Sequence, residues 1–302
     1  MFSSRSCKIE LEKEAYHSGE IVNGKVRCNF AKECTVRDLT ITFSGKARVR
    51  WEDGDDTYSK IETLFELTSR LLQCQTKFSP GDYVYPFTFN FPDNLPSSVE
   101  VACGGSSRGS IRYKARAEID KEWSLGCSCE KVFNVLPRNE CNLISASPVE
   151  RTIEKIPTTF STHGPIQLTV TLPDDRYVPS QAVPFVARLK NDSGTTVKEL
   201  RFNITQGFTF HIYNRKKEIT PVRTDQLVVI NSVVEPGSKN LWNLQLTIPE
   251  DMFVGTSSNC NIMKVFWKLK GEVCLPFPHR NMHIEIPLRL APRPESEKAL
   301  IQ

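Results

Sequence analysis

The chain has 302 residues, and its 39 Lys and Arg against 35 Asp and Glu give a formal net charge of +4. This length fits two domains of ordinary size, each large enough to bury its own core. The small positive charge argues against nucleic-acid binding, for which a strong basic excess is expected. The sequence has no apolar run of the roughly 18–20 residues that span a membrane, and its N-terminus lacks the apolar core of a signal peptide. We therefore expect a cytoplasmic protein without a transmembrane segment.

Apolar and polar residues alternate with a period of two along much of the chain. From Ile111 to Ile119 the odd positions are apolar and the even positions are charged, which predicts a half-buried strand. In chain order we expect strands at 7–12, 21–29, 37–44, 46–51, 83–91, 111–119, 131–136, 166–172, 183–190, 198–206, 226–234, 241–248, 262–270 and 282–290. The segment Ile61 to Gln73 stays open, because its leucines fit a helical period and a strand followed by a loop fits equally well.

One arrangement of turns and strands occurs twice. The pair Pro80–Gly81 leads through an aromatic strand to Phe91–Asp93, and Pro236–Gly237 leads through a Trp-containing strand to Ile248–Glu250. Short alternating strands separated by such turns favour antiparallel β-sandwiches. We predict two copies of one sandwich: a first domain over 1–137, a linker over 138–163, a second domain over 164–291 and a disordered tail over 292–302.

The ten cysteines do not form a recognisable site. The only close pair is Cys127 and Cys129, which is not the C-x-x-C spacing of zinc or redox motifs. We expect reduced thiols that act as small core hydrophobes. Redox regulation through one reactive cysteine stays open as an alternative.

The sequence offers no constellation for a reaction. His279 and His283 could share a metal on a helix, but their surroundings predict a strand, where positions four apart are about 13 Å distant. The glycine-rich stretch Gly104 to Ser110 precedes a strand and has no phosphate-loop pattern. We therefore predict that the protein is not an enzyme and has no catalytic residue, cofactor or metal.

Cations gather on two of the expected strands. Their even positions carry Lys46, Arg48 and Arg50 in one strand and Arg112, Lys114 and Arg116 in the other. Two interpretations remain open. These side chains form a basic surface for acidic or phosphorylated segments, or they form an ordinary solvated face balanced by acids such as Glu118.

Two segments of the first half and one of the second carry a resemblance to a known family. Residues Tyr85–Ser98 and Gly109–Asp120 resemble the arrestin family, most closely its α-arrestin branch. The stretch from Gly164–Leu168 to Tyr177–Ser180 resembles the start of that family's C-terminal domain. The resemblance covers about residues 7–291. It implies an all-β fold of two immunoglobulin-like antiparallel sandwiches, the arrestin N and C domains, in tandem.

The resemblance also implies a function. Such proteins are cytosolic adaptors that bind cytoplasmic parts of membrane proteins and direct their endocytosis, ubiquitination or endosomal sorting, with recruitment to the plasma membrane or endosomes. It makes Lys8 a further candidate for cargo binding beside the six cations above. No two prolines are adjacent, so the PPxY motif that docks ubiquitin ligases is missing and we expect any such ligase to be engaged indirectly. The alternative is a soluble coat-like subunit, as in retromer.

Overall fold

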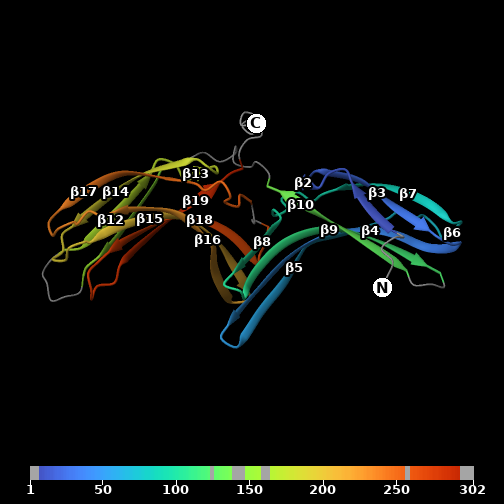
Figure 1. Ribbon diagram of the computed structural model, residues 1–302, viewed down its shortest axis with the longest axis horizontal. Coiled ribbons are helices and arrows are strands. Elements are labelled where there is room, and N and C mark those ends of the chain that lie inside the picture. The colour runs from blue at the N-terminus through green and yellow to red at the C-terminus, as the bar shows by residue number, and fades with distance from the viewer. Residues whose placement is uncertain (1–6, 123–125, 138–146, 158–163, 256–258, 293–302) are drawn as a thin grey trace. The chain divides into compact units, whose positions relative to one another are not determined.

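The computed structural model describes residues 7–122, 126–137, 147–157, 164–255 and 259–292, and every regular element among them is a β-strand (Figure 1). The predicted all-β fold of two sandwich domains is confirmed. Two compact units divide the chain. Unit 1 comprises Met1–Arg138, Thr209–Ile219 and Gly255–Lys264, and unit 2 comprises Asn139–Phe208, Thr220–Val254 and Val265–Gln302.

Unit 1 is a sandwich of two sheets formed by the first ten strands. These are β1 (Cys7–Leu11), β2 (Ala15–His17), β3 (Ile21–Phe30), β4 (Cys34–Asp53), β5 (Asp56–Arg70), β6 (Thr76–Phe78), β7 (Gly81–Asn90), β8 (Val99–Cys103), β9 (Ser107–Lys121) and β10 (Cys127–Leu136). One sheet has the order β1-β3-β7. The other has the order β2-β10-β9-β4-β5, with β6 paired to β4 and β8 paired to β9.

Aromatic rings fill the space between these sheets. Phe43 of β4 stacks on Phe89 of β7 with 4.5 Å between ring centroids. Tyr113 of β9 is fully buried, and its hydroxyl donates a hydrogen bond to the buried carbonyl of Pro96. Because β9 alternates between buried residues and residues that are partly or fully exposed, the packing of Tyr113 fixes which side chains of this strand face outward.

Strand β4 is one continuous strand where two, 37–44 and 46–51, are expected. Gly45 lies between the two predicted pieces and is part of the strand, and the position favours glycine because a Cβ there would lie 2.5 Å from the Tyr113 ring. The open segment from Ile61 is also settled as strand, since β5 continues to Arg70 and pairs with β4 along its length.

Two segments from the C-terminal half of the chain belong to unit 1. The carboxylate of Glu62 in β5 accepts hydrogen bonds from the backbone N–H groups of Asn261 at 2.9 Å and Ile262 at 3.1 Å. Trp51 of β4 stacks with Phe210, with 6.3 Å between ring centroids. The sequence pattern does not reveal that these two segments belong to unit 1, because the contacts join residues that lie far apart in the chain.

The remaining strands build unit 2, although the ends of three of them reach into unit 1. They are β11 (Val149–Lys155), β12 (Ile166–Leu172), β13 (Arg176–Tyr177), β14 (Ala182–Asn191), β15 (Glu199–Ile212), β16 (Arg215–Ile230), β17 (Lys239–Thr247), β18 (Met263–Cys274) and β19 (Met282–Leu290). Their sheets have the orders β11-β12-β14-β17 and β13-β19-β18-β15-β16.

The region expected as a linker, 138–163, contains strand β11. This strand pairs with β12 along its whole length, and its Val149 and Ile153 pack against the core of unit 2. The rest of that linker, 138–146 and 158–163, lies outside the described residues, as does the expected tail from residue 293 onward.

Replacing Tyr113 with Phe tests the hydrogen bond beneath β9. Tyr113→Phe leaves the buried Pro96 carbonyl without its partner, so we expect the free energy of unfolding to fall by about 1–3 kcal/mol. Chemical denaturation monitored by Trp fluorescence measures this change. Tyr213→Phe is the matched control, since Tyr213 is 87% exposed. Equal stability of the Tyr113→Phe variant and the wild type would contradict the assigned role of this hydroxyl.

Candidate functional site

The ladder between β4 and β9 brings the predicted cations together. In this antiparallel pair Lys46 lies opposite Arg112, Arg48 opposite Ser110, and Arg50 opposite Arg108. Paired residues share one face of a sheet. That face is the exposed one, because Ala47, Val49 and Ile111 between these positions are buried.

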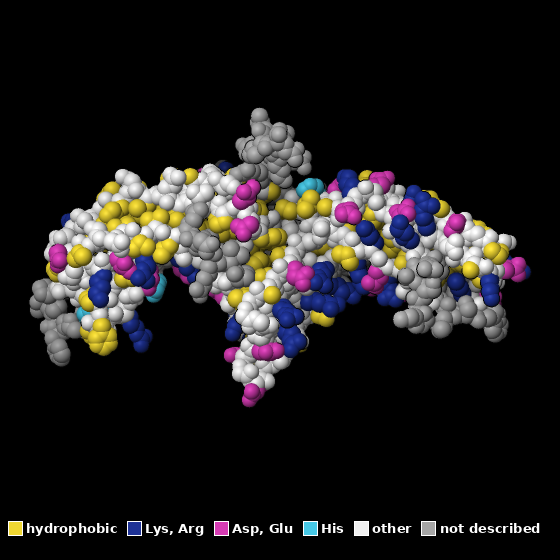
Figure 2. All heavy atoms as spheres, in the orientation of Figure 1, with side chains coloured by type: hydrophobic (Ala, Val, Ile, Leu, Met, Phe, Trp, Pro, Cys, Tyr) yellow, Lys and Arg dark blue, Asp and Glu magenta, His cyan; other side chains and the backbone are white. Residues whose placement is uncertain are grey.

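We call the six positions Lys46, Arg48, Arg50, Arg108, Ser110 and Arg112 the basic array. Figure 2 shows Lys and Arg side chains gathered over the part of unit 1 that Figure 1 labels β4, β5 and β9. Five of the six positions are cations, and Ser110 adds a hydroxyl between them. Strand β5 places the exposed side chain of Ile61 beside Arg48. The array is therefore an open, cationic surface with an apolar rim.

Two pairs in the basic array set like charges directly opposite each other. These pairs are Lys46–Arg112 and Arg50–Arg108. Like charges at directly opposed positions of a sheet destabilise the fold. A pair of this kind is relieved when an anion lies between its members, because each cation then has an opposite charge to face. In the Lys46–Arg112 pair both members already face carboxylates, whereas in the Arg50–Arg108 pair Arg50 faces Glu52.

Carboxylates neutralise only part of the basic array. Glu66 pairs with Lys46 at 3.4 Å, Glu52 pairs with Arg50 at 3.0 Å, and Glu100 pairs with Arg112. The hydrogen bond from Arg112 lowers the pKa of Glu100. Among the residues that the structure describes, Arg48 and Arg108 have no ion-pair partner. Both guanidinium groups are exposed and free to bind a ligand.

The other predicted cations of β9 are already paired with acids. Lys114 lies 2.7 Å from Glu130, and Arg116 lies 2.8 Å from Glu118 and 3.7 Å from Glu130. At this end of the cationic face the positive charges therefore face carboxylates. The free positive charge is concentrated in the basic array.

Lys8 lies in the other sheet of unit 1 and does not join the basic array. It sits on β1, exposed, where its ammonium group lies 3.2 Å from Glu10. The carboxylate of Glu10 also accepts from Arg27 at 3.0 Å and lies 3.4 Å from Lys25. The hydrogen bond from Arg27, followed by that from Lys8, lowers the pKa of Glu10 to about 2.

Sequence reasoning missed Arg108. The alternation that identifies β9 begins at Ser107, whereas the expected strand begins at residue 111 because Gly104 to Ser110 is interpreted as a loop. Arg108, Ser110 and Arg112 are spaced two apart, and this spacing is the signal that would have found Arg108.

Unit 2 carries a groove of about 370 Å³ whose charges balance. Its lining includes Arg201, Lys270, Glu272 and Glu285. Arg201 pairs with Glu272 at 3.7 Å, and Lys270 pairs with Glu285 at 3.4 Å. In the described parts of the chain no three His, Cys, Asp or Glu side chains form a group that could hold a metal, and no helix is long and apolar enough to cross a membrane.

Comparison with known families matches both halves of the chain. Residues 7–142 match the arrestin (or S-antigen) N-terminal domain, and residues 162–295 match the arrestin (or S-antigen) C-terminal domain. The two matched ranges contain nearly all of the described residues, including the basic array.

Individual relatives align with most of this chain at low sequence identity. Arrestin domain-containing protein 4 of Mus musculus is 26% identical over 94% of this chain and 70% of its own length. Arrestin domain-containing protein 1 of Rattus norvegicus is 25% identical over 97% of this chain and 68% of its own length. Arrestin domain-containing protein B of Dictyostelium discoideum is 22% identical over 86% of this chain and 41% of its own length.

Removing one member of a like-charge pair should stabilise unit 1. Arg108→Thr leaves Arg50 without an opposed cation, so we expect the free energy of unfolding to rise by about 0.2–1 kcal/mol. Urea denaturation measures the change. Arg37→Thr is the control, because Arg37 pairs with Asp120 at 3.0 Å and its loss brings no relief. If Arg108→Thr lowers the free energy of unfolding as much as Arg37→Thr does, the repulsion between Arg50 and Arg108 is not significant.

The Glu10 carboxylate and the cations around it, Lys8, Lys25 and Arg27, form a cluster that we call the Glu10 cluster. Its carboxylate should titrate at a much lower pH than an ordinary carboxylate. We expect an NMR titration midpoint of about pH 2 for the Glu10 side chain, against 4.5 for an unperturbed Glu. Because this pKa is lowered in the folded state, the stability that the cluster adds is complete above pH 4.5 and is lost as the pH falls toward 2. Arg27→Met removes the largest cause and should raise the midpoint. An unchanged midpoint in that variant would contradict the assignment.

Proposed function

This chain belongs to the arrestin family, in its α-arrestin branch, and we propose that it is a cytoplasmic, non-enzymatic adaptor that binds cytoplasmic segments of membrane proteins. Family membership supports an adaptor-type role in general. The basic array supports the finer proposal, because it supplies a surface suited to an acidic segment of a partner.

The observation that carries the proposal is the pair of unneutralised guanidinium groups in the basic array. Arg48 and Arg108 lie on adjacent strands and are diagonal neighbours across the ladder, with Ser110 beside both. Guanidinium groups bind carboxylates and phosphates through paired, charge-assisted hydrogen bonds. An extended acidic segment that crosses β4 and β9 would meet both groups and would also separate the opposed pairs.

The proposed adaptor directs its bound membrane protein to endocytosis, ubiquitination or endosomal sorting. It acts at the plasma membrane or at endosomes, to which it is recruited by the membrane protein that it binds. In this proposal a ubiquitin ligase is engaged indirectly, through a further bound protein.

An affinity capture from membranes extracted in mild detergent tests the proposal. The baits are the native chain and the triple variant Arg48→Glu, Arg108→Glu and Arg112→Glu. We expect mass spectrometry to find integral membrane proteins on the native bait and about tenfold less of them on the variant. The charge reversal turns attraction for an acidic segment into repulsion.

The control bait carries Arg37→Glu, Arg70→Glu and Lys77→Glu. It changes the net charge equally within unit 1, at cations paired with Asp120, Asp38 and Glu33. Similar losses on both variants would exclude the basic array as the binding site. Recovery of a stoichiometric soluble complex in place of membrane proteins would instead support the coat-like subunit.

A further inference from the structure

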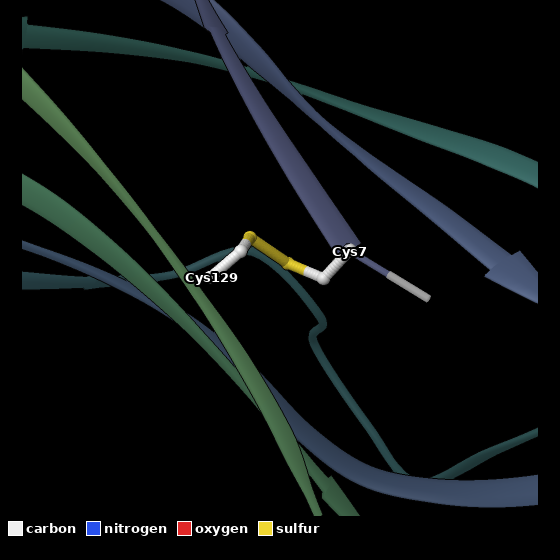
Figure 3. The surroundings of a disulfide bond; sticks show 2 residues. All are labelled: Cys7 and Cys129. Atoms are coloured by element: carbon white, nitrogen blue, oxygen red, sulfur yellow. A yellow bond between two sulfur atoms is a disulfide. The ribbon is translucent and has the colours of Figure 1, made fainter. Parts of the chain in front are cut away.

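A disulfide joins the two sheets of unit 1. It links Cys7 of β1 to Cys129 of β10, with 5.7 Å between their Cα atoms and a sequence separation of 122 residues (Figure 3). The expectation that all cysteines are reduced is therefore wrong for this pair. The pairing depends on which strands face each other across the sandwich, and sequence spacing does not reveal that.

Two further cysteines accompany this disulfide. Cys28 of β3 lies opposite Cys7 in the β1–β3 ladder, and Cys127 lies two residues before Cys129 on the same side of β10. Both are free thiols. Three strands thus bring four cysteines to one end of the sandwich, although each strand contributes no more than two.

Burial divides these cysteines into two classes. Cys7 and Cys28 are buried, with 6% and 1% of their surfaces exposed, whereas Cys127 and Cys129 are partly exposed. Burial raises the pKa of the Cys28 thiol to about 12, so this group holds its proton at neutral pH. The bond that forms joins Cys129 to Cys7, and Cys28 lies behind Cys7 in the β1–β3 ladder as a free thiol.

We propose that Cys7 and Cys129 are a reversible oxidation site that responds to hydroperoxides, with Cys129 as the residue that reacts first and Cys7 as the residue that forms the disulfide. The assignment of roles follows from access. A small oxidant reaches the partly exposed Cys129 before it reaches Cys7, which lies within bonding distance of Cys129 but is covered.

The reaction balances with one hydroperoxide for each disulfide. The Cys129 thiolate attacks the peroxide O–O bond, takes up one oxygen as sulfenic acid and releases the other as water or as an alcohol. The Cys7 thiolate then attacks the Cys129 sulfur, the S–S bond forms, and hydroxide leaves and is protonated to water. Two thiols supply the two electrons that reduce the peroxide.

A dithiol reductant reverses the reaction. Its thiolate attacks the exposed Cys129 sulfur, and Cys7 leaves as a thiolate. The second thiol of the reductant then attacks the mixed disulfide, which oxidises the reductant and frees Cys129.

The oxidation state of Cys7 and Cys129 controls how β1 is attached to the opposite sheet. Strand β1 is a five-residue edge strand whose only backbone ladder is to β3, so the disulfide is its covalent connection to the opposite sheet. A link between residues so far apart in sequence strongly restricts the unfolded chain. We expect reduction to lower the melting temperature of unit 1 by roughly 5 °C or more and to speed amide exchange in β1.

The test begins with the full chain reduced, freed of reductant and treated with a small excess of hydrogen peroxide. After free thiols are alkylated, the chain is digested without reductant and analysed by mass spectrometry. We expect the Cys7–Cys129 cross-link to be the main product and to disappear after treatment of the folded protein with dithiothreitol. Cys28→Ser and Cys74→Ser are controls that should retain the cross-link, since Cys74 is an exposed thiol outside this cluster.

Trapping with dimedone, which labels sulfenic acids, tests the order of the two steps. In the Cys7→Ser variant we expect peroxide to give a label on Cys129, and in the Cys129→Ser variant we expect no label on Cys7. The proposal is overturned if another cysteine pair dominates in the wild type, if Cys7 is labelled, or if dithiothreitol fails to open the link in the folded chain. The wild-type cross-link map decides the question even if a variant does not fold.

Discussion

The antiparallel ladder between β4 and β9 determines both the core of unit 1 and the position of its free positive charge. It runs from the Val36–Lys121 pair to the Arg50–Arg108 pair. Because side chains alternate along a strand, each apolar pair that enters the core is followed by a pair that must face solvent. The aromatic core and the basic array are therefore two faces of one ladder, and a register shift by one residue would exchange them.

This dependence explains how unit 1 tolerates opposed cations. Tyr113 and Phe43 hold the ladder in register from the buried side, so the repulsion between Arg50 and Arg108 cannot be relieved by a slip of β4 against β9. The core supplies much more stabilisation than one like-charge pair removes. The opposition of Arg50 and Arg108 thus persists in the folded state, with Glu52 paired to Arg50 at 3.0 Å.

Alternation predicted most strands of this fold, and its failures have physical causes. The expected strands 37–44 and 46–51 form one strand that continues through Gly45, where the missing Cβ makes room for the Tyr113 ring. Strand β11 is not predicted because its exposed residues are polar and its apolar positions are few. Six of the seven predicted cations fell on one face because they share two adjacent strands, but Lys8 could not be placed without knowing the sheet order. The Cys7–Cys129 pairing depends on the same information.

Strand β10 connects the disulfide to the cationic face. Cys129 points from it toward β1, and the next residue, Glu130, points outward and pairs with Lys114 and Arg116 of β9. Any change in how β10 is held acts first on this neutralised end of the face. The basic array lies at the other end, where β5 and β8 flank β4 and β9. Strand β10 borders β9 from Tyr113 to Ile119, and β8 borders it from Ser107 to Ile111, so different neighbours flank the two ends of one continuous β4–β9 ladder.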